Sequence, residues 1–588
     1  MKLAPALVLA AGCLQIPEPA PPECTQDADC ETSLGEVCNA GVCYGGPPSG
    51  QFAAVLVPPS SRSDLASYEI PSLTLPNDGN FGAITFERGV TLVGRVETVC
   101  ALPACDGTSA GATLLVSRPS LFPGGAGFQA VTISQDGLQP GSNSFSVVVP
   151  RTNPGDPPYT ISVVPAGNGL FPPANGVLSA AMLAPPIHLS VTTDVSSLGT
   201  IQLGASDAMT ISGSLLDGAG HALVKYRVVA RGRFEPGGAI TDVSSVAYTS
   251  DGQFSLVLAP TAIGPISIVA QPYDTNVVAP VLTVAGLDVH SGARTLAQPP
   301  NLGNKSTISI LVEGLFGNGE VTPVAGAHVA VTASYDPMNG GTSAVLSRGV
   351  TTGDDGIAKL DVLDGPTFAG SYTVQVVPPA GSELGVVYNQ PLALDAIEPI
   401  RLPGRLALHG RVLDHSGAPV AGLAVTARPS VRFKWTMPDA DALAFLGEIP
   451  APTAVTGAGG DFSVFVDISV GRDPDVVWGF YDLAFDAPTG VALASYTVGD
   501  IMIPRDSTLE NLTLADTILP DTAYLHGNLA DIGNQRIVGG ELRIFQVATD
   551  AQICDEVPFP PPDCVIPALL VGRGTSDDLG TLKLALPR

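Results

Sequence analysis

Cysteine is the residue type whose number and spacing in this sequence most directly imply chemistry. The 588 residues contain nine cysteines, and eight of them fall into local groups. These groups are Cys24, Cys30, Cys38 and Cys43, then Cys100 and Cys105, and then Cys554 and Cys564. Close, even-numbered grouping predicts disulfides and hence an oxidising compartment. Zinc is the alternative for the group of four, but its gaps contain no Cys-x-x-Cys pair. The sequence does not choose among the possible pairings.

Cys13 is left outside these groups, and the residues before it give a reason. Lys2 is positively charged, residues 3–11 are mostly apolar, and small residues precede the cysteine. The stretch 9–13, Leu-Ala-Ala-Gly-Cys, resembles the lipobox of bacterial lipoprotein signals. The resemblance implies that residues 1–12 are removed and that Cys13 is acylated. Two or more acyl chains make a stable membrane anchor. Leu14 follows in place of an aspartate, which in that family favours the outer membrane or cell surface. A plain secretory signal, with a periplasmic or secreted product, is the alternative.

Catalytic patterns are weak throughout the sequence. The histidines are spread singly, and no His-Glu-x-x-His occurs. Ser109 lies in a G-x-S-x-G match at 107–111, but a strand-like segment follows where a nucleophile elbow needs a helix. The acidic turn at 353–356, and Asp439 with Asp441, lack the ligand spacing of an EF-hand. We therefore predict no enzyme activity, no metal and no cofactor.

The charge balance excludes one large class of partner. The formal net charge is -28, and lysine and arginine form no local cluster. Such a surface repels phosphate backbones, so nucleic acid is excluded as a partner. The acidity fits the solubility of an exported protein, with dedicated cation binding as the alternative.

The composition indicates many short strands joined by turns. Only 14% of the residues are charged, whereas glycine and proline number 66 and 54. Alternation of valine and leucine with threonine and serine is typical of strands. A proline-rich stretch at 16–22 precedes the cysteine-rich segment and predicts an extended tether.

A repeated pattern organises the chain after residue 50. Each copy begins with a strand containing a marker glycine, followed by a turn and a returning strand; the markers are Gly94, Gly213, Gly314, Gly410 and Gly527. A Gly/Asp turn and another strand follow, at 250–260, 353–363, 457–466 and 576–587. A strand opening with tyrosine closes three copies, at 159–166, 372–379 and 481–488. The fifth copy stops before this strand, so either other strands close that domain or the chain is incomplete.

The pattern G-x-V-x-D-x-x-G-x-P-V-x-G-x-x-V, followed by T-x-x-x-G-x-F-x-L and Y-x-L-x-V, is clearest at 406–488. It resembles the carboxypeptidase regulatory-like domain, a transthyretin-like, Ig-like β-sandwich of seven antiparallel strands. The segment at 24–43 resembles the cysteine-rich modules of myxobacterial-type surface lipoproteins. The resemblance implies fold and export and no catalysis, since nothing here matches the zinc domain of metallocarboxypeptidases.

We therefore predict an all-β chain of about five tandem sandwiches after a small disulfide-rich segment. The predicted boundaries are a signal peptide at 1–12, a lipidated cysteine with tether and module at 13–50, and sandwiches at 51–178, 179–286, 287–394, 395–505 and 506–588. Further strands between the copies, at 187–193, 400–406 and 501–506, are expected to pack onto the sandwiches. Five domains in line would reach on the order of 150–200 Å.

The predicted function is a non-enzymatic surface lipoprotein that presents its sandwiches for binding or adhesion. The membrane, through Cys13, and an extracellular protein or glycan are the expected partners. The long insertion at 430–450 carries Phe433 and Trp435, which are the candidate ligand contacts. These rings could instead fold back onto the local core. A purely structural stalk or envelope component is the alternative function.

Overall fold

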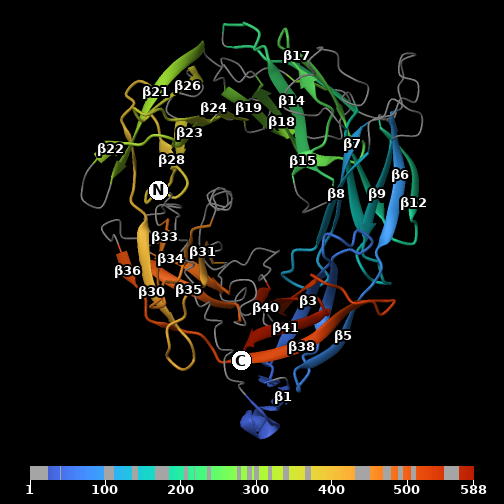
Figure 1. The fold of residues 1–588 in the computed structure, drawn as a ribbon. Coiled ribbons are helices and arrows are strands. Elements are labelled where there is room, and N and C mark those ends of the chain that lie inside the picture. Colours follow the sequence, from blue (N-terminus) through green and yellow to red (C-terminus); the bar gives the residue numbers. More distant parts are fainter. Residues whose placement is uncertain are drawn as a thin grey trace, which may run out of the picture.

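The computed structural model of the chain is built from strands (Figure 1). It describes residues 24–39, 41–98, 111–134, 143–165, 184–203, 209–217, 219–234, 240–273, 280–287, 294–296, 304–315, 321–335, 343–347, 349–364, 372–430, 451–467, 478–487, 494–504, 511–547 and 568–588. Within these ranges the only helical elements are two 3-10 turns, η1 (Asp27–Asp29) and η2 (Thr32–Leu34). None of the described segments is a helix of the length and apolarity needed to cross a membrane. The predicted all-β class is confirmed.

The first sandwich shows the repeating unit. It consists of β6 (Val90–Thr98), β7 (Ala112–Arg118), β8 (Phe128–Ser134), β9 (Ser144–Val149), β10 (Tyr159–Pro165), β11 (Ile187–Val191) and β12 (Ser197–Leu203). One sheet has the order β12-β6-β9 and the other β11-β10-β7-β8. The seventh strand, β12, runs parallel to the first strand, β6, whereas the other neighbouring strands in the two sheets are antiparallel. Buried residues alternate with less buried ones along β10, so its apolar face packs inward.

The second, third and fourth sandwiches repeat this arrangement. The second contains β13 (Met209–Ser214), β14 (Tyr226–Arg233), β15 (Thr241–Asp242), β16 (Ala247–Tyr248), β17 (Gln253–Leu258), β18 (Ile263–Pro272), β19 (Pro280–Leu287) and β20 (Arg294–Leu296). The third contains β21 (Asn304–Leu315), β22 (Val321–Pro323), β23 (His328–Tyr335), β24 (Ser343–Ser347), β25 (Val350–Thr351), β26 (Ile357–Asp364), β27 (Tyr372–Val377), β28 (Val387–Pro391) and β29 (Ile400–Leu402). The fourth contains β30 (Leu406–Leu413), β31 (Ala424–Pro429), β32 (Thr453–Val455), β33 (Asp461–Val466), β34 (Trp478–Asp486), β35 (Tyr496–Pro504), β36 (Asn511–Thr513) and β37 (Thr517–Ile518). In the second and third the last strand pairs in parallel with the first, and in the fourth both β36 and β37 do so. The extra strands expected between the copies therefore belong to the sandwiches.

The fifth sandwich is assembled from both ends of the chain. Its first four strands are β38 (Thr522–Asp531), β39 (Glu541–Val547), β40 (Leu569–Thr575) and β41 (Thr581–Pro587). Its last three are β3 (Gln51–Val57), β4 (Tyr68–Leu73) and β5 (Asn80–Phe86). Strand β3 pairs with β39, and β5 runs parallel to β38, so each takes the place that β10 and β12 hold in the first sandwich. Residues 51–86 were predicted to belong to the first sandwich, but strand pairing joins them to the fifth.

The marker glycines make room for a large side chain on the neighbouring strand. Gly94 pairs with Phe145 and Gly410 with Phe462, and a Cβ on either glycine would lie 2.6 and 2.4 Å from the phenylalanine ring. In the third sandwich the equivalent position is Ile310, opposite the small Ala358. Gly314 was therefore the wrong marker there, because this copy reverses which strand carries the bulky residue. The property that these copies share is a small residue on one strand facing a large residue on its partner, so that the pair fills the same volume.

Two other sequence predictions, the tyrosine strands and the acidic turns, have clear structural counterparts. Tyr159 is fully buried, and its hydroxyl donates to the carbonyl of Pro150 at 2.8 Å. Asp355 accepts the backbone N–H of Ile357 at 3.0 Å, as expected for a turn. Asp414 likewise accepts the N–H groups of Ser416 and Ala418, at 2.9 and 2.8 Å. The Ser416 hydroxyl also donates to this carboxylate, at 2.7 Å, and is the largest cause that lowers the pKa of Asp414, followed by the Ala418 N–H.

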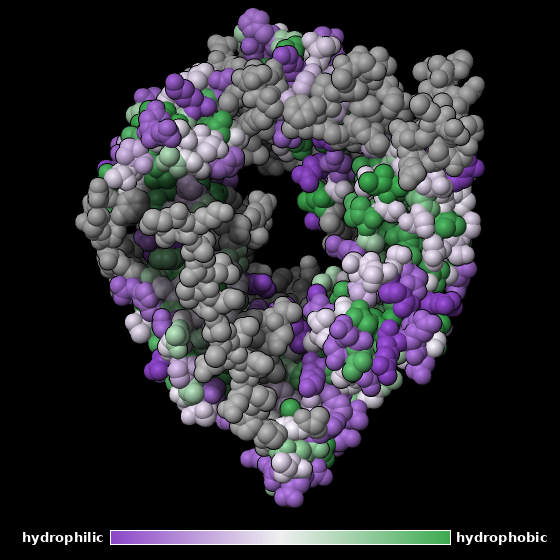
Figure 2. All heavy atoms as spheres, in the orientation of Figure 1, coloured by the Kyte–Doolittle hydropathy of each residue, from purple (hydrophilic) through white to green (hydrophobic). Residues whose placement is uncertain are grey.

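The five sandwiches are arranged in a closed ring, with an opening that stays visible when all heavy atoms are drawn (Figures 1 and 2). Contacts join each sandwich to the next, and the fifth to the first. They are the His188 ring on Phe234, β19 paired with β24, the Val386 N–H on Asp467, the Arg573 guanidinium on the Ala487 carbonyl, and the Ser120 hydroxyl on Glu69. The expected row of domains is therefore replaced by a ring, because residues 51–86 return to the last sandwich.

Candidate functional site at the meeting of the chain ends

The cysteine-rich module is a small hairpin tied by two disulfides. Strands β1 (Val37–Asn39) and β2 (Val42–Tyr44) form the hairpin. Cys24 bonds to Cys38 and Cys30 bonds to Cys43, with Cα–Cα separations of 5.8 and 5.7 Å. The prediction of disulfides at these four cysteines is confirmed, and the structure supplies the pairing that the spacing left open.

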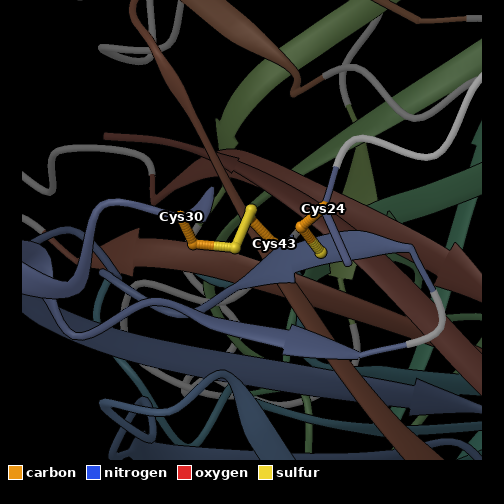
Figure 3. A group of neighbouring side chains, drawn as sticks. All are labelled: Cys24, Cys30 and Cys43. Carbon is orange, nitrogen blue, oxygen red and sulfur yellow. A yellow bond between two sulfur atoms is a disulfide. The ribbon is translucent and has the colours of Figure 1, made fainter. Parts of the chain in front are cut away.

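The same cysteines form the only group of three potential metal ligands found close together in the described part of the chain (Figure 3). The sulfur atoms of Cys24, Cys30 and Cys43 lie within 4.8 Å of one another. Zinc binds thiolates, and a sulfur in a disulfide has no thiolate to offer. The grouping is therefore a consequence of two neighbouring disulfides in a very small core.

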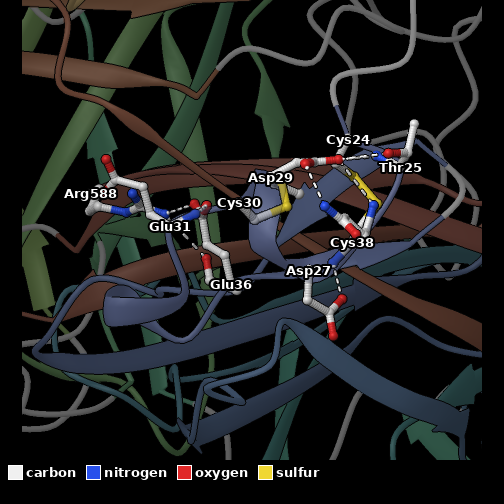
Figure 4. The surroundings of a disulfide bond; sticks show 12 residues. Cys24, Thr25, Asp27, Asp29, Cys30, Glu31, Glu36, Cys38 and Arg588 are labelled. Atoms are coloured by element: carbon white, nitrogen blue, oxygen red, sulfur yellow. Dashed lines mark hydrogen bonds and ion pairs between the residues drawn. A yellow bond between two sulfur atoms is a disulfide. The ribbon is translucent and has the colours of Figure 1, made fainter.

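Carboxylates order the turns around the disulfides (Figure 4). Asp29 accepts the backbone N–H and the hydroxyl of Thr25, at 2.7 and 2.8 Å. The backbone bond from Thr25 is the largest cause that lowers the pKa of Asp29 to about 2. Asp27 accepts the N–H of Cys38 at 2.9 Å. The module thus holds its shape through local hydrogen bonds as well as disulfides, which suits a segment too small for its own apolar core.

The module docks on the fifth sandwich. Tyr44, which is 3% exposed, meets the ring of His526 edge-on at 4.4 Å between centroids. The N–H of Gly45 donates to the carbonyl of Tyr524 at 3.0 Å. Burial is the largest cause that lowers the pKa of His526, so the docked state favours its neutral imidazole.

Arg588 links the module to the end of β41. Its guanidinium donates to the carboxylate of Glu36, to the Gly46 carbonyl at 3.1 Å and to Asp521 at 3.0 Å. Its side chain is 17% exposed, so these bonds are partly shielded from water. Figure 4 shows Arg588 beside Glu36. Residues from the two ends of the described chain are therefore held by one cation.

A cavity of about 390 Å³ opens between the module, the fourth sandwich and the fifth. Its lining includes Asp29, Glu31, Glu36, Asp414, His415, Tyr496, Asp521, Tyr524 and Arg588. Most of these carboxylates have partners in the protein: Asp29 and Asp414 in their turns, and Glu36 and Asp521 on Arg588. We therefore interpret the cavity as the joint at which three folded units meet.

The junction between the fifth and first sandwiches combines an apolar contact with a buried carboxylate. Phe122, 4% exposed, lies 5.8 Å from the ring of Phe545. Glu69 on β4 is 5% exposed and accepts the hydroxyl of Ser120 and the N–H of Leu121, at 2.9 and 2.7 Å. A buried carboxylate needs such donors, so Glu69 fixes the loop after β7 in place.

Several predicted site residues lie outside the described residues. They are the lipidation residue Cys13, the remaining disulfide candidates Cys100, Cys105, Cys554 and Cys564, the ligand-contact candidates Phe433 and Trp435, and Ser109, Asp439 and Asp441. These assignments stay predictions.

Three of the described histidines, His188, His221 and His415, lie in turns or at junctions. His221 pairs with Asp217 at 3.0 Å within one turn, and His415 faces Asp521 at 3.6 Å. His188 lies near the hydroxyl of Ser162 at 3.3 Å, but its ring stacks on Phe234 of the next sandwich. These positions explain the three histidines structurally.

The residues that close the ring, above all Arg588, Tyr44 and Phe122, were not among the predicted site residues. One signal could have found the closure. Residues 51–86 form three strands ahead of the first marker glycine, and the fifth copy is short of three strands. The number of extra strands before the first copy therefore equals the number that the fifth copy lacks.

Comparison with known proteins gives only distant similarity. No protein-family model matches the chain, and a search of curated proteins finds no relative. Among solved structures, the minor pilin GBS52 of Streptococcus agalactiae has 12% identity and a TM-score of 0.20, covering 36% of this chain and 95% of that one. The major pilin RrgB of Streptococcus pneumoniae has 11% identity and a TM-score of 0.11, covering 72% and 99%. Two B repeats of the collagen-binding protein of Staphylococcus aureus have 10% identity and a TM-score of 0.12, covering 73% and 99%. At such TM-scores we base no conclusion on these similarities.

Proposed function

We propose that this chain is an exported, non-enzymatic surface protein whose ring of sandwiches is a scaffold for binding a protein or glycan. The observation that carries the proposal is the disulfide-tied module docked on the ring-closing sandwich. Disulfides persist in oxidising compartments. Cys24 belongs to this module, which docks on the one sandwich built from both ends of the described chain.

Anchoring is tested at Cys13. The tether and the lipobox-like residues support acylation of Cys13 at the outer membrane or cell surface. We expect Cys13→Ser to move the protein from the membrane fraction to the soluble fraction without changing its unfolding temperature. Retention of the Cys13→Ser protein in the membrane fraction would rule out the lipid anchor.

Ligand binding is tested on the insertion of the fourth sandwich. Loops carried by a rigid scaffold are common binding sites, and Phe433 and Trp435 supply aromatic anchors there. We expect the soluble Cys13→Ser protein to bind a member of a glycan and envelope-protein panel. Trp435→Ala should weaken that binding at least about tenfold, equivalent to about 1.4 kcal/mol.

A matched control uses the same sandwich. Val455 on β32 is 66% exposed, and Val455→Ala should leave binding unchanged. Equal losses in the two variants would place the contact elsewhere on the sandwich. No binding across the panel would favour the purely structural role.

A further inference from the structure

Residues 51–86 behave as a donated part of the fifth sandwich. Strand β3 forms a seven-residue ladder with β39, and β5 pairs in parallel with β38. The donated segment buries Phe52, Leu56 and Phe86, which are 5%, 0% and 0% exposed. Their partners come from the other end of the chain, so neither part can bury its apolar face without the other.

The donated segment is fixed to the first sandwich and not only to the fifth. Only residues 87–89 separate β5 from β6. Glu69 of β4 bonds to Ser120 and Leu121 of the first sandwich, and Leu65 forms a β-bridge with Arg88. If the segment left the fifth sandwich, the contacts of Glu69 with the first sandwich would remain.

One surface therefore closes the ring. On one side lie the donated strands and the module, and on the other lie β38–β41 with Arg588 and Phe545. The other junctions join sandwiches that are consecutive along the chain. Each copy consequently carries one donor and one complementary acceptor. Two such surfaces on different copies could make the same contacts.

We propose that residues 51–86 of one copy complete the fifth sandwich of a second copy. The exchanged interface reuses the contacts of the ring-closing surface, so the preference between the two depends on concentration. Closure within one chain has an effective concentration in the millimolar range and dominates in dilute solution. Crowding of copies, at high concentration or on a surface, favours exchange into paired rings or head-to-tail chains.

Two complementary full-length variants test this proposal. The donor-defective variant carries Phe52→Asp and Leu56→Asp, and the acceptor-defective variant carries Leu542→Asp and Ile544→Asp, whose side chains are fully buried opposite β3. Each alone should be monomeric, with the first four sandwiches protected in hydrogen exchange. Mixed, they should form a 1:1 complex of twice the monomer mass, measured by light scattering after size exclusion. No complex, while the four sandwiches stay protected, would overturn the proposal.

A second measurement does not depend on damaged variants. Two wild-type preparations with different affinity tags are mixed at low and at tenfold higher concentration, warmed below the unfolding temperature and then cooled. Mixed-tag species should increase with concentration, and the donor-defective variant should give none. A Leu579→Asp control adds charge at an exposed position, 61% accessible, outside the ladder and should exchange like the wild type. Absence of mixed species from the wild type at both concentrations would also overturn the proposal.

Discussion

The fourth and fifth sandwiches reach the same strand pairing from different parts of the chain. In the fourth, all strands come from Leu406–Ile518, and β34 pairs with β31 while β36 runs parallel to β30. In the fifth, β3 pairs with β39 and β5 runs parallel to β38, although the paired strands come from opposite ends of the chain. The place of a strand in the sheet, and not its order in the sequence, decides which core it completes.

The difference has a consequence for folding. The fourth sandwich can form from local contacts, whereas the fifth must close a loop that contains the other four. Such non-local pairing is slow to form, but the entropy of closure grows only slowly with loop length. We therefore expect the fifth sandwich to form last and to be comparably stable once formed.

The largest effect is expected from truncating one buried leucine in the fourth sandwich and one in the fifth. Leu56 and Leu408 are both fully buried, and Leu→Ala in such sites costs about 2–5 kcal/mol. Leu408→Ala should destabilise the fourth sandwich and leave the ring closed. Leu56→Ala should release residues 51–86 and the module. Hydrogen exchange resolved by sandwich measures both, and loss of protection only in the fourth sandwich for both variants would contradict the comparison.

Removal of a disulfide should affect the module and not the ladder. Cys30 and Cys43 are 13 residues apart, and a loop of this size predicts about 3 kcal/mol of stabilisation. The double substitution Cys30→Ser with Cys43→Ser should expose the module to protease, while β3 stays protected in hydrogen exchange. Loss of β3 protection would mean that the module holds the ring closed.

The marker glycines sharpen the comparison. A Cβ at Gly410 meets the Phe462 ring within the fourth sandwich, whereas a Cβ at Gly527 meets Phe81 of the donated strand β5 at 3.0 Å. Each Gly→Ala change should cost about 1–3 kcal/mol through overpacking. Only Gly527→Ala should loosen β5.

A compensating pair tests the same volume rule. Gly410→Ile with Phe462→Ala copies the arrangement of Ile310 and Ala358 in the third sandwich. We expect the double variant to recover part of the stability that the two single variants lose. Strictly additive losses in thermal unfolding would argue against volume complementarity.

Acidification is expected to give the smallest effect, by weakening the docking of the cysteine-rich module on the fifth sandwich. Burial, to which the docked Tyr44 ring contributes, lowers the pKa of His526 below the ordinary histidine value of about 6.5. Docking is therefore at full strength above that pH and weakens as the pH falls through it. Protease sensitivity of the module at pH 7.5 and 5.5 measures this change, and His526→Gln should remove the difference between the two. The carboxyl of Asp29, with a pKa of about 2, adds a separate loss only below about pH 4.

Local patterns in the sequence predict most of the single sandwich. Alternating strands, glycine and aspartate turns and the buried tyrosine at 159 are all visible there, since each depends on neighbouring residues. The group of cysteines at 24–43 likewise predicts disulfides, although their pairing depends on the hairpin that brings Cys38 opposite Cys43.

Ring closure could not be predicted in the same way. The fit between β3 and β39 is a property of two segments with no shared local pattern, and the Arg588 contacts depend on where the chain end lies. The predicted marker Gly314 was wrong for a related reason. In the third sandwich the large residue, Ile310, stands on the strand where other copies have the glycine, and the small Ala358 faces it. Only the match between three surplus strands at the start and three absent strands at the end signals the closure.

Small-angle X-ray scattering of the soluble Cys13→Ser protein in dilute solution tests the ring most directly. We predict one compact particle. Its maximum dimension should be well below the length of about 150–200 Å that five domains in a row would have. The donor-defective variant should be longer than the wild type. A wild-type particle as long as the row, with scattering unchanged in that variant, would contradict closure by residues 51–86.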